Sequence, residues 1–541
     1  MTATCTAYTN APHSTALLVD YLYHFDRVSH FYNGSPYDFA SYQRVANDMR
    51  RLEIPRREMV EILARQNREW GCPEPTLANL DRLKDAGTCA VVTGQQVGLF
   101  SGPAYTLFKA LTAVRLAQAL AEQGLPCVPV FWLATEDHDL AEVQESATFD
   151  EAYELIPLRD GGDSPSARAP VGLVRHTAEV VAALDRLESV LPEGESRAQL
   201  LRDLRDCYEP GTTWGRSFAK FLTRLLGRWG VILLDPLDDA VHRLSARVYE
   251  EALVRAPELR TQVLDRSHDL IQHGYHAQVH TAEDSTLVFA IHNGDRVPLH
   301  QQNGKFLLDG NEEISPARLR SWLEEKPLDF SSNVLLRSLV QDTLLPTVAY
   351  VAGPSELAYL GQAQVLYQAF RRPQPVVFPR AAFTLVDAHT DRLMEKYHLC
   401  LDDVWQGEEH LSRKIAGVGF AQGWSERFDQ SEKDLAQLLQ RLHEDIEKLD
   451  PTLVDTLKHV QEKMTYQMER LRGKLTRAAL GRSELLSRHT QTLLRSLLPH
   501  KDFQERRVGG VYFLGRAGYG LLERMLSHIQ TRCSDHQTLT Y

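Results

Sequence analysis

Short apolar runs that end in polar turns recur along this chain, and they constrain its fold more than any other feature. The first two runs are CAVVTG from Cys89 and CVPVFWLA from Cys127, and an apolar-periodic helix that starts near Pro103 lies between them. This order is typical of a βαβ unit. Three further runs follow at 229–236, 347–356 and 374–380. Five buried strands that alternate with helices predict an α/β fold with a doubly wound parallel sheet.

The segments around these strands differ in composition and in the spacing of their apolar residues. Residues 1–87 carry apolar residues at helical spacing, so we expect a helical segment packed on a core that spans 88–390. Two insertions are expected in that core. One covers about 155–215 and includes the Gly/Ser/Pro loop GGDSPSARAP. The other covers about 270–330, where two Asn-Gly signals between alternating runs predict a small antiparallel sheet.

Residues 391–499 predict a long helical arm, and 500–541 a segment that returns to the core. Apolar residues are spaced 4, 3, 4, 4, 3, 4 in one stretch, an 11-residue repeat: Leu453, Leu457, Val460, Met464, Met468, Leu471 and Leu475. A helix that continued to Leu498 would be about 70 Å long. Residues 435–449 can fold back on it as a hairpin. Because such a rod buries its stripe only against a partner, we expect a homodimer; an intramolecular two-helix arm is the alternative.

Charge and cysteine usage exclude several classes of protein. Sixty Lys and Arg against 72 Asp and Glu give a net charge of −12, which disfavours binding to nucleic acid or to an anionic membrane surface. The amino-terminal residues lack the basic and apolar regions of a signal peptide, and no apolar run is long enough to span a membrane, so a cytoplasmic protein is expected. The seven cysteines never take CxxC or zinc-finger spacing, and we expect them to be reduced, with Cys89 and Cys127 buried.

Polar residues follow every predicted strand, and the carboxyl ends of parallel strands are where ligands bind in an open sheet. The densest group is TEDHD, in which Glu136, Asp137 and Asp139 surround His138. Three carboxylates this close together favour a cation, an ammonium substrate or a shared proton. We predict a general base with ammonium ligands and no metal ion; capping of the following helix by Glu136 or Asp137 is the alternative. Zinc is not expected at HGYHAQVH (273–280) either, because the residues after it resemble a strand.

The glycine turn GQQVGLFSGP follows the first strand, and it contains Gly94, Gly98 and Gly102. It is neither a P-loop nor a dinucleotide fingerprint. Its backbone N–H groups and the start of the next helix suit an anion or a carboxylate, although such turns are also common for steric reasons. Lys109, two turns into that helix, could reach a phosphate or simply face solvent.

Three joined motifs are specific to one family: VVTGQQVGLFSGPAYTLFKA, VPVFWLATEDHDLAEV and NVLLRSLVQDTLLPTVAYVAGPSELAYLGQ, followed by PVVFPR and FQERRV. With them the chain resembles the BshC family, the cysteine ligases of bacillithiol biosynthesis, from Tyr21 to about Val508. The resemblance implies a Rossmann-like core with insertions, a coiled-coil dimerisation arm, and the addition of cysteine to glucosaminyl-malate.

The implied reaction assigns roles to the polar residues. Amide formation needs an activated acyl group, which makes ATP or ADP and Mg²⁺ the candidate cofactors. Asp137 or Glu136 would hold the sugar ammonium while His138 takes its proton, with Glu136 or Asp139 as the alternative base. The predicted substrate-binding residues are Gln95, Gln96, Thr135, Asp139, Asn333, Arg337, Tyr350, Ser355, Glu356 and Arg380. The predicted nucleotide-binding residues are Gly94, Gly98, Gly102, Lys109 and Gly353. The competing functions are a nucleotide-binding transferase for another amine or sugar, and a non-catalytic coiled-coil scaffold.

Overall fold

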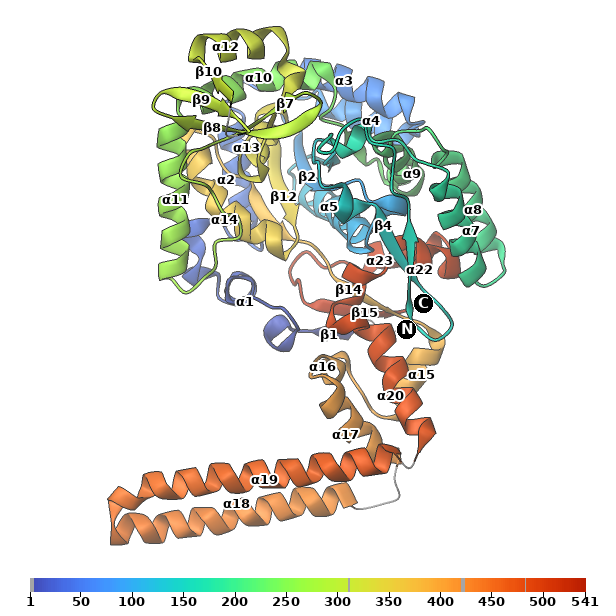
Figure 1. Cartoon of the computed structure of the whole chain (residues 1–541), viewed down its shortest axis with the longest axis vertical. Coiled ribbons are helices and arrows are strands. Elements are labelled where there is room, and N and C mark those ends of the chain that lie inside the picture. The colour runs from blue at the N-terminus through green and yellow to red at the C-terminus, as the bar shows by residue number, and fades with distance from the viewer. Residues whose placement is uncertain (1–3, 310–311, 420–423, 482) are drawn as a thin grey trace.

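A computed structural model describes residues 4–309, 312–419, 424–481 and 483–541 of the chain. It has a rounded body from which a two-helix arm projects (Figure 1). The body contains the parallel sheet and both insertions, and the arm leaves it through a short helical neck. The amino and carboxyl ends of the chain lie close together where the neck meets the body (Figure 1).

A five-stranded, all-parallel sheet forms the centre of the body. Its order is β13-β12-β2-β3-β6. The strands are β2 (Cys89–Gln95), β3 (Cys127–Leu133), β6 (Ile232–Leu234), β12 (Thr347–Ala352) and β13 (Val376–Pro379). Every residue of these five strands is buried except Gln95 at the end of β2, because helices cover both faces of the sheet. The predicted doubly wound parallel sheet is confirmed.

Helices from distant parts of the sequence cover this sheet. α5 (Tyr105–Glu122) packs on β2 and β3, and α3 (Arg56–Glu69) packs on β6. The other helices around the sheet are α1 (Ala16–Tyr23), α2 (Phe39–Met49), α4 (Glu74–Leu83), α10 (Asp239–Val254), α11 (Ala256–Gln272), α13 (Val334–Leu344) and α14 (Pro354–Ala369). The amino-terminal segment is therefore helical as expected, apart from the short strand β1 (Thr4–Thr6).

The expected antiparallel insertion is a second five-stranded sheet of order β10-β9-β8-β7-β11. Its elements are β7 (Ser285–His292), β8 (Asp295–Gln302), β9 (Lys305–Leu308), β10 (Glu312–Ile314), α12 (Pro316–Glu325) and β11 (Phe330–Ser332). Both Asn-Gly pairs make the hairpin turns: Asn293, Gly294, Asn303 and Gly304 all have positive φ. The turn residues explain why this segment forms hairpins.

The other insertion lies on the opposite side of the body (Figure 1). It begins with α6 (Leu140–Val143) and the hairpin of β4 (Glu145–Phe149) and β5 (Leu155–Arg159). Three helices follow: α7 (Glu179–Val190), α8 (Glu195–Cys207) and α9 (Trp214–Leu226). The loop between the hairpin and these helices contains the Gly/Ser/Pro stretch.

A three-stranded sheet joins the two ends of the chain. In it β15 (His536–Thr540) lies between β1 and β14 (Phe383–Val386). The helices of the neck and of the carboxyl-terminal segment are α15 (Ala388–Lys396), α16 (Leu401–Trp405), α17 (Glu408–Gly419), α20 (Glu484–Leu497), α21 (Gln504–Arg507), α22 (Gly510–Ala517) and α23 (Gly520–His528).

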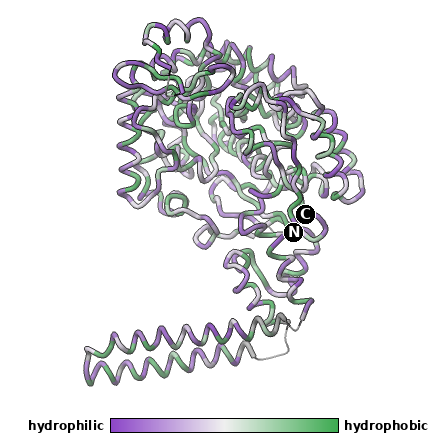
Figure 2. Tube along the Cα trace, in the orientation of Figure 1, coloured by the Kyte–Doolittle hydropathy of each residue, from purple (hydrophilic) through white to green (hydrophobic). Residues whose placement is uncertain are grey.

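The arm is an antiparallel hairpin of α18 (Trp424–Leu449) and α19 (Val454–Gly481), both amphipathic along their length (Figures 1 and 2). The hairpin prediction is confirmed, but the prediction of one helix that continues to Leu498 is wrong. α19 ends at Gly481, after 28 residues or about 42 Å. The Ser483 hydroxyl then accepts from the Leu486 N–H and caps α20, which packs on α15 and α17. The glycine and the capping serine separate the two helices.

Candidate active site

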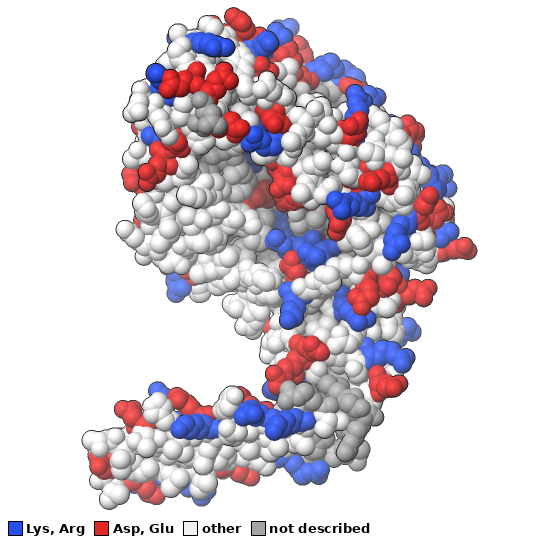
Figure 3. All heavy atoms as spheres, viewed as in Figure 1, with Lys and Arg blue, Asp and Glu red and all other residues white. Residues whose placement is uncertain are grey.

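A cavity of about 670 Å³ opens at the carboxyl ends of the parallel strands. The ends of β2, β3, β12 and β13 form its floor, and β7 and β8 of the antiparallel insertion form a wall. Figure 3 shows basic and acidic side chains together around the hollow in the centre of this face. The predicted edge of the sheet is therefore the place where a polar ligand fits.

Thirteen predicted residues line this cavity. They are Gly94, Gln95, Gln96, Lys109, Glu136, Asp137, Asn333, Arg337, Tyr350, Gly353, Ser355, Glu356 and Arg380. Asn333 also caps α13, because its side chain accepts from the Leu336 N–H.

The other five predicted residues, Gly98, Gly102, Thr135, His138 and Asp139, lie outside the lining. A Cβ on Gly98 would sit 2.8 Å from the Gly102 Cα, so these glycines meet a steric requirement. Thr135 is fully buried and donates to Asp235 Oδ1 at 2.5 Å. Asp139 caps α6 through the Glu142 N–H. Asp139 is therefore the capping residue of TEDHD, which corrects the alternative that Glu136 or Asp137 caps the following helix.

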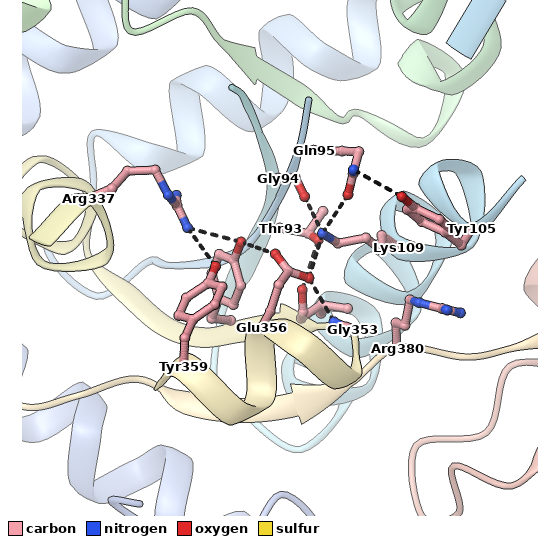
Figure 4. A network of polar contacts seen from close by, with 12 residues as sticks. Thr93, Gly94, Gln95, Tyr105, Lys109, Arg337, Gly353, Glu356, Tyr359 and Arg380 are labelled. Atoms are coloured by element: carbon pink, nitrogen blue, oxygen red, sulfur yellow. Dashed lines mark hydrogen bonds and ion pairs between the residues drawn. The ribbon is translucent and has the colours of Figure 1, made fainter. Parts of the chain in front are cut away.

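Lys109 and Glu356 form a buried ion pair in the cavity floor (Figure 4). Lys109 Nζ lies 2.6 Å from Glu356 Oε2 and also donates to the Gly94 carbonyl and to Gln95 Oε1. Glu356 in turn accepts from the Gly353 N–H and from the Tyr350 hydroxyl. Burial lowers the pKa of Lys109, and Glu356 opposes that effect. The three N–H groups of Lys109 are thus used within the protein, which corrects the idea that it is free to reach a phosphate.

Arg337 is a partly buried cation that lines the cavity, and its contacts are all neutral. Its guanidinium donates to Gln341 Oε1 at 3.2 Å and to the Tyr350 hydroxyl at 3.3 Å. It also donates to the Tyr359 hydroxyl at 3.2 Å (Figure 4). Among the described residues no carboxylate oxygen lies within 4 Å of it. A charge that is partly withdrawn from water is stabilised by a charged partner, so Arg337 keeps bonding capacity for an anionic ligand.

Arg380 differs from Arg337, although both line the cavity. Its guanidinium lies 2.5 Å from Glu505 Oε1, and both side chains are buried. The second Glu505 oxygen accepts from the Phe383 N–H. This pair ties the end of β13 to α21 and neutralises the charge of Arg380, which is one of the predicted substrate-binding residues. We therefore correct the role of Arg380 to a structural one.

Carboxylates form the opposite side of the cavity. The Gln96 amide donates to Asp137 Oδ2 at 2.7 Å and to Glu142 Oε2 at 2.8 Å, which holds these two acids together at the cavity surface. Glu136 lies deeper, where its Oε1 is 3.2 Å from His242 Nε2. Burial works against protonation of His242, but the neighbouring Glu136 carboxylate raises the pKa of the histidine. The Asp137–Glu142 pair is the part of this wall that can accept an ammonium group.

His138 is held by a cation from the antiparallel insertion. Arg296 NH1 lies 2.9 Å from His138 Nδ1, and Nε and NH2 of Arg296 donate to Ser331 Oγ and to the Ser332 carbonyl. A guanidinium can only donate, so Nδ1 is the acceptor and the ring hydrogen sits on Nε2. Burial and Arg296 lower the pKa of His138. A ring in this state donates a hydrogen bond and has no free lone pair, which corrects its prediction as the general base.

Comparison with known proteins gives the family of the chain. Residues 1–381 match the model for the Rossmann-like amino-terminal domain of the bacillithiol biosynthesis protein BshC. Residues 383–541 match the model for its carboxyl-terminal coiled-coil domain. The chain belongs to the BshC family. The resemblance, the Rossmann-like fold and the coiled coil are thereby confirmed, as is a role in bacillithiol biosynthesis.

Relatives in this family align with the chain from end to end. The protein of Solibacter usitatus is 35% identical over 100% of both chains, and that of Koribacter versatilis is 34% identical over 99% of both. The protein of Salinibacter ruber is 31% identical over 97% of this chain and 96% of its own. Each is named "Putative cysteine ligase BshC".

Several polar residues of this BshC-family cavity were not predicted from the sequence, among them Glu142, His280, Arg296 and His300. Glu142 lies three residues beyond the TEDHD motif, and Arg296, His280 and His300 come from or near the antiparallel insertion. The signal for two of them was present in the alternation RVPLH at 296–300. On β8 the apolar Val297 and Leu299 are buried, so Arg296 and His300 share the other face.

The histidines of HGYHAQVH separate in the structure. His280 lines the cavity, whereas His273 approaches His30 and Asp269, with ligand atoms within 4.8 Å of one another. These three side chains lie outside the cavity lining, and His30 and His273 are exposed. In the described part of the chain, no helix has the length and apolar character that crossing a membrane requires.

Proposed function

We propose that this chain is a cysteine ligase that joins the carboxyl group of cysteine to the amino group of glucosaminyl-malate and so forms bacillithiol. The names of the relatives support the ligase class, and the family supports the pathway. We propose ATP as the source of activation, because amide formation in water is uphill.

The observation that carries this proposal is the pairing of opposite charges across one cavity. Arg337 offers a partly buried guanidinium without a carboxylate partner, and Asp137 with Glu142 offers a carboxylate pair. Glucosaminyl-malate carries the complementary groups, two carboxylates and an amine. We propose that Arg337 binds a malyl carboxylate and that Asp137 and Glu142 bind the sugar ammonium.

The nucleotide belongs to the same proposal, with Mg²⁺ on its phosphates. The Gly353 N–H and Lys109 both bond to Glu356, so a phosphate at that point would have to replace the Glu356 carboxylate. This requirement favours a phosphate position closer to Arg506, which also lines the cavity.

The decisive experiment is to incubate the purified protein with glucosaminyl-malate, cysteine and ATP–Mg²⁺ and to detect bacillithiol by mass spectrometry. Omission of each component in turn, and replacement of ATP by a non-hydrolysable analogue, are the controls. We expect product only in the complete mixture. A product from another amine would support the transferase, and no turnover with any amine would favour the scaffold.

We also propose that a second copy of the chain packs on the arm. The stripe predicted for α19 stays largely exposed: Leu453, Val460, Met464, Leu471 and Leu475 are 39–50% exposed, whereas Leu457 is buried against the hairpin. Such a stripe is typical of a helix that packs on another chain. The seven free cysteines fit the reducing cytoplasm, which we propose as the compartment.

A further inference from the structure

His300 and Asp284 form a hydrogen-bonded pair on the wall of the cavity. His300 lies on β8, on the same face as Arg296 and Pro298, and all three line the cavity. Its Nδ1 is 2.8 Å from Asp284 Oδ1. The pair comes from the antiparallel insertion, outside the TEDHD motif and the glycine turns.

The hydrogen bonds around Asp284 fix which nitrogen of His300 carries the hydrogen. Asp284 Oδ2 accepts from Gln302 Nε2 at 2.9 Å, and the Asp284 carbonyl accepts from the Gln301 N–H. The bond from Gln302, followed by that from His300, lowers the pKa of Asp284, so the carboxylate stays ionised near neutral pH. An ionised carboxylate only accepts, so His300 donates from Nδ1 and its Nε2 keeps a free lone pair.

The two histidines of this region are therefore in opposite states. Arg296 donates to Nδ1 of His138 and leaves that ring as a donor. Asp284 accepts from Nδ1 of His300 and leaves that ring as an acceptor. A carboxylate on the far nitrogen also stabilises the imidazolium that forms when such a ring takes a proton.

We propose that His300, oriented by Asp284, is the general base that takes the proton from the attacking amine. This inference rests on the proposed ligase function. The bound ammonium first releases one proton to water, and the neutral amine nitrogen then attacks the carbonyl carbon of a cysteine whose carboxyl group is activated as a phosphate or nucleotidyl ester. As the C–N bond forms, the nitrogen loses its proton to His300 Nε2. The C–O bond to the phosphate or nucleotide then breaks, and that group leaves with the bonding electrons.

Other charged groups around the pair are Arg296 on β8, His280 and Glu283 on the segment before β7, and Lys305 and Glu313, which pair on β9 and β10. The side chains of His300 and Asp284 are 23% and 30% exposed. The proton that His300 takes up can therefore pass to water after each turnover.

The test measures steady-state bacillithiol formation by wild type, His300→Asn and a matched control. His292→Asn is that control, because His292 lies on the neighbouring strand β7, pairs with Glu312 and does not line the cavity. We expect kcat of His300→Asn to fall about 10²-fold or more, with KM for glucosaminyl-malate little changed. The control should keep wild-type kcat. Circular dichroism on each variant checks the fold.

Two further measurements separate a base from a structural residue. The kcat/KM of wild type should rise with pH along an acid limb that His300→Asn abolishes. Asp284→Asn should move that limb to lower pH, because the carboxylate that stabilises the imidazolium is lost. Added imidazole should restore part of the rate in His300→Ala, which also decides the matter if His300→Asn folds poorly. Wild-type kcat in folded His300→Asn, or an unshifted limb with no imidazole rescue, overturns the inference. An inactive wild type would instead defeat the proposed function.

Discussion

The buried pair of Arg380 and Glu505 gives the sharpest test of how this body is held together. The two side chains are 6% and 2% exposed, and the pair joins the end of β13 to α21. Glu505→Gln keeps the shape of the side chain and removes its charge, which leaves the Arg380 guanidinium buried without a counter-ion. Loss of one partner from a buried pair costs about 3–5 kcal/mol, and we expect a loss of that size in the free energy of unfolding.

Equilibrium urea unfolding, followed by circular dichroism, measures this change through the midpoint at constant slope. The double variant Arg380→Met, Glu505→Met removes both charges, so it should be clearly more stable than Glu505→Gln. Glu523→Gln is the matched control, because Glu523 pairs with Arg228 on the surface and its loss should cost less than about 1 kcal/mol.

Two results would refute this reasoning. If Glu505→Gln unfolds within about 0.5 kcal/mol of wild type, Glu505 does not neutralise Arg380 in the folded protein. If the double variant is stable but its KM for glucosaminyl-malate rises tenfold or more, Arg380 binds the substrate after all. A stable double variant with normal KM supports the structural role.

Three other predictions use different parts of the molecule. Arg337→Met should raise KM for glucosaminyl-malate by about tenfold or more with the fold intact, and an unchanged KM would remove Arg337 from the substrate site. Burial lowers the pKa of His536 to about 4, so the unfolded chain takes up this proton first as the pH falls below 6.5. The contribution of His536 to the free energy of unfolding is therefore fully present above pH 6.5 and about 3 kcal/mol smaller at pH 4. His536→Gln should abolish this pH-dependent loss in urea unfolding. Met464→Glu should halve the mass of a dimer in light scattering and leave helix content unchanged; a wild-type monomer would refute the dimer.

The parallel strands were predictable because their chemistry is local. A strand covered on both faces shows an uninterrupted apolar run, and each run ended in a polar turn at the same edge of the sheet. The antiparallel hairpins were predictable from Asn293-Gly294 and Asn303-Gly304, since few other residues adopt the backbone that their turns require. The break between α19 and α20 also had a local signal in Gly481 and Ser483, but the apolar stripe outweighed it.

Partner choice was not predictable, because it depends on contacts between residues far apart in the chain. Arg337 and Arg380 look alike as sequence, yet only Arg380 meets a carboxylate, and that carboxylate lies 125 residues away. His138 cannot act as the predicted base because its Nδ1 accepts from Arg296, which lies 158 residues away. The local sequence thus indicated which residue types gather at the edge of the sheet. Their protonation states and their unused hydrogen-bonding groups depend on the tertiary fold.

Strand β8 links the register of the insertion to the chemistry of the cavity. Arg296 and His300 face the cavity only because Val297 and Leu299, between them, are buried in the core. A shift of one residue in the pairing with β7 would turn both polar side chains into the core and both apolar ones into the cavity. The burial of two aliphatic side chains therefore fixes the positions of the cation that holds His138 and of the imidazole that stays free to accept a proton. The packing of this hairpin and the position of the proposed base therefore depend on the same five residues, 296–300.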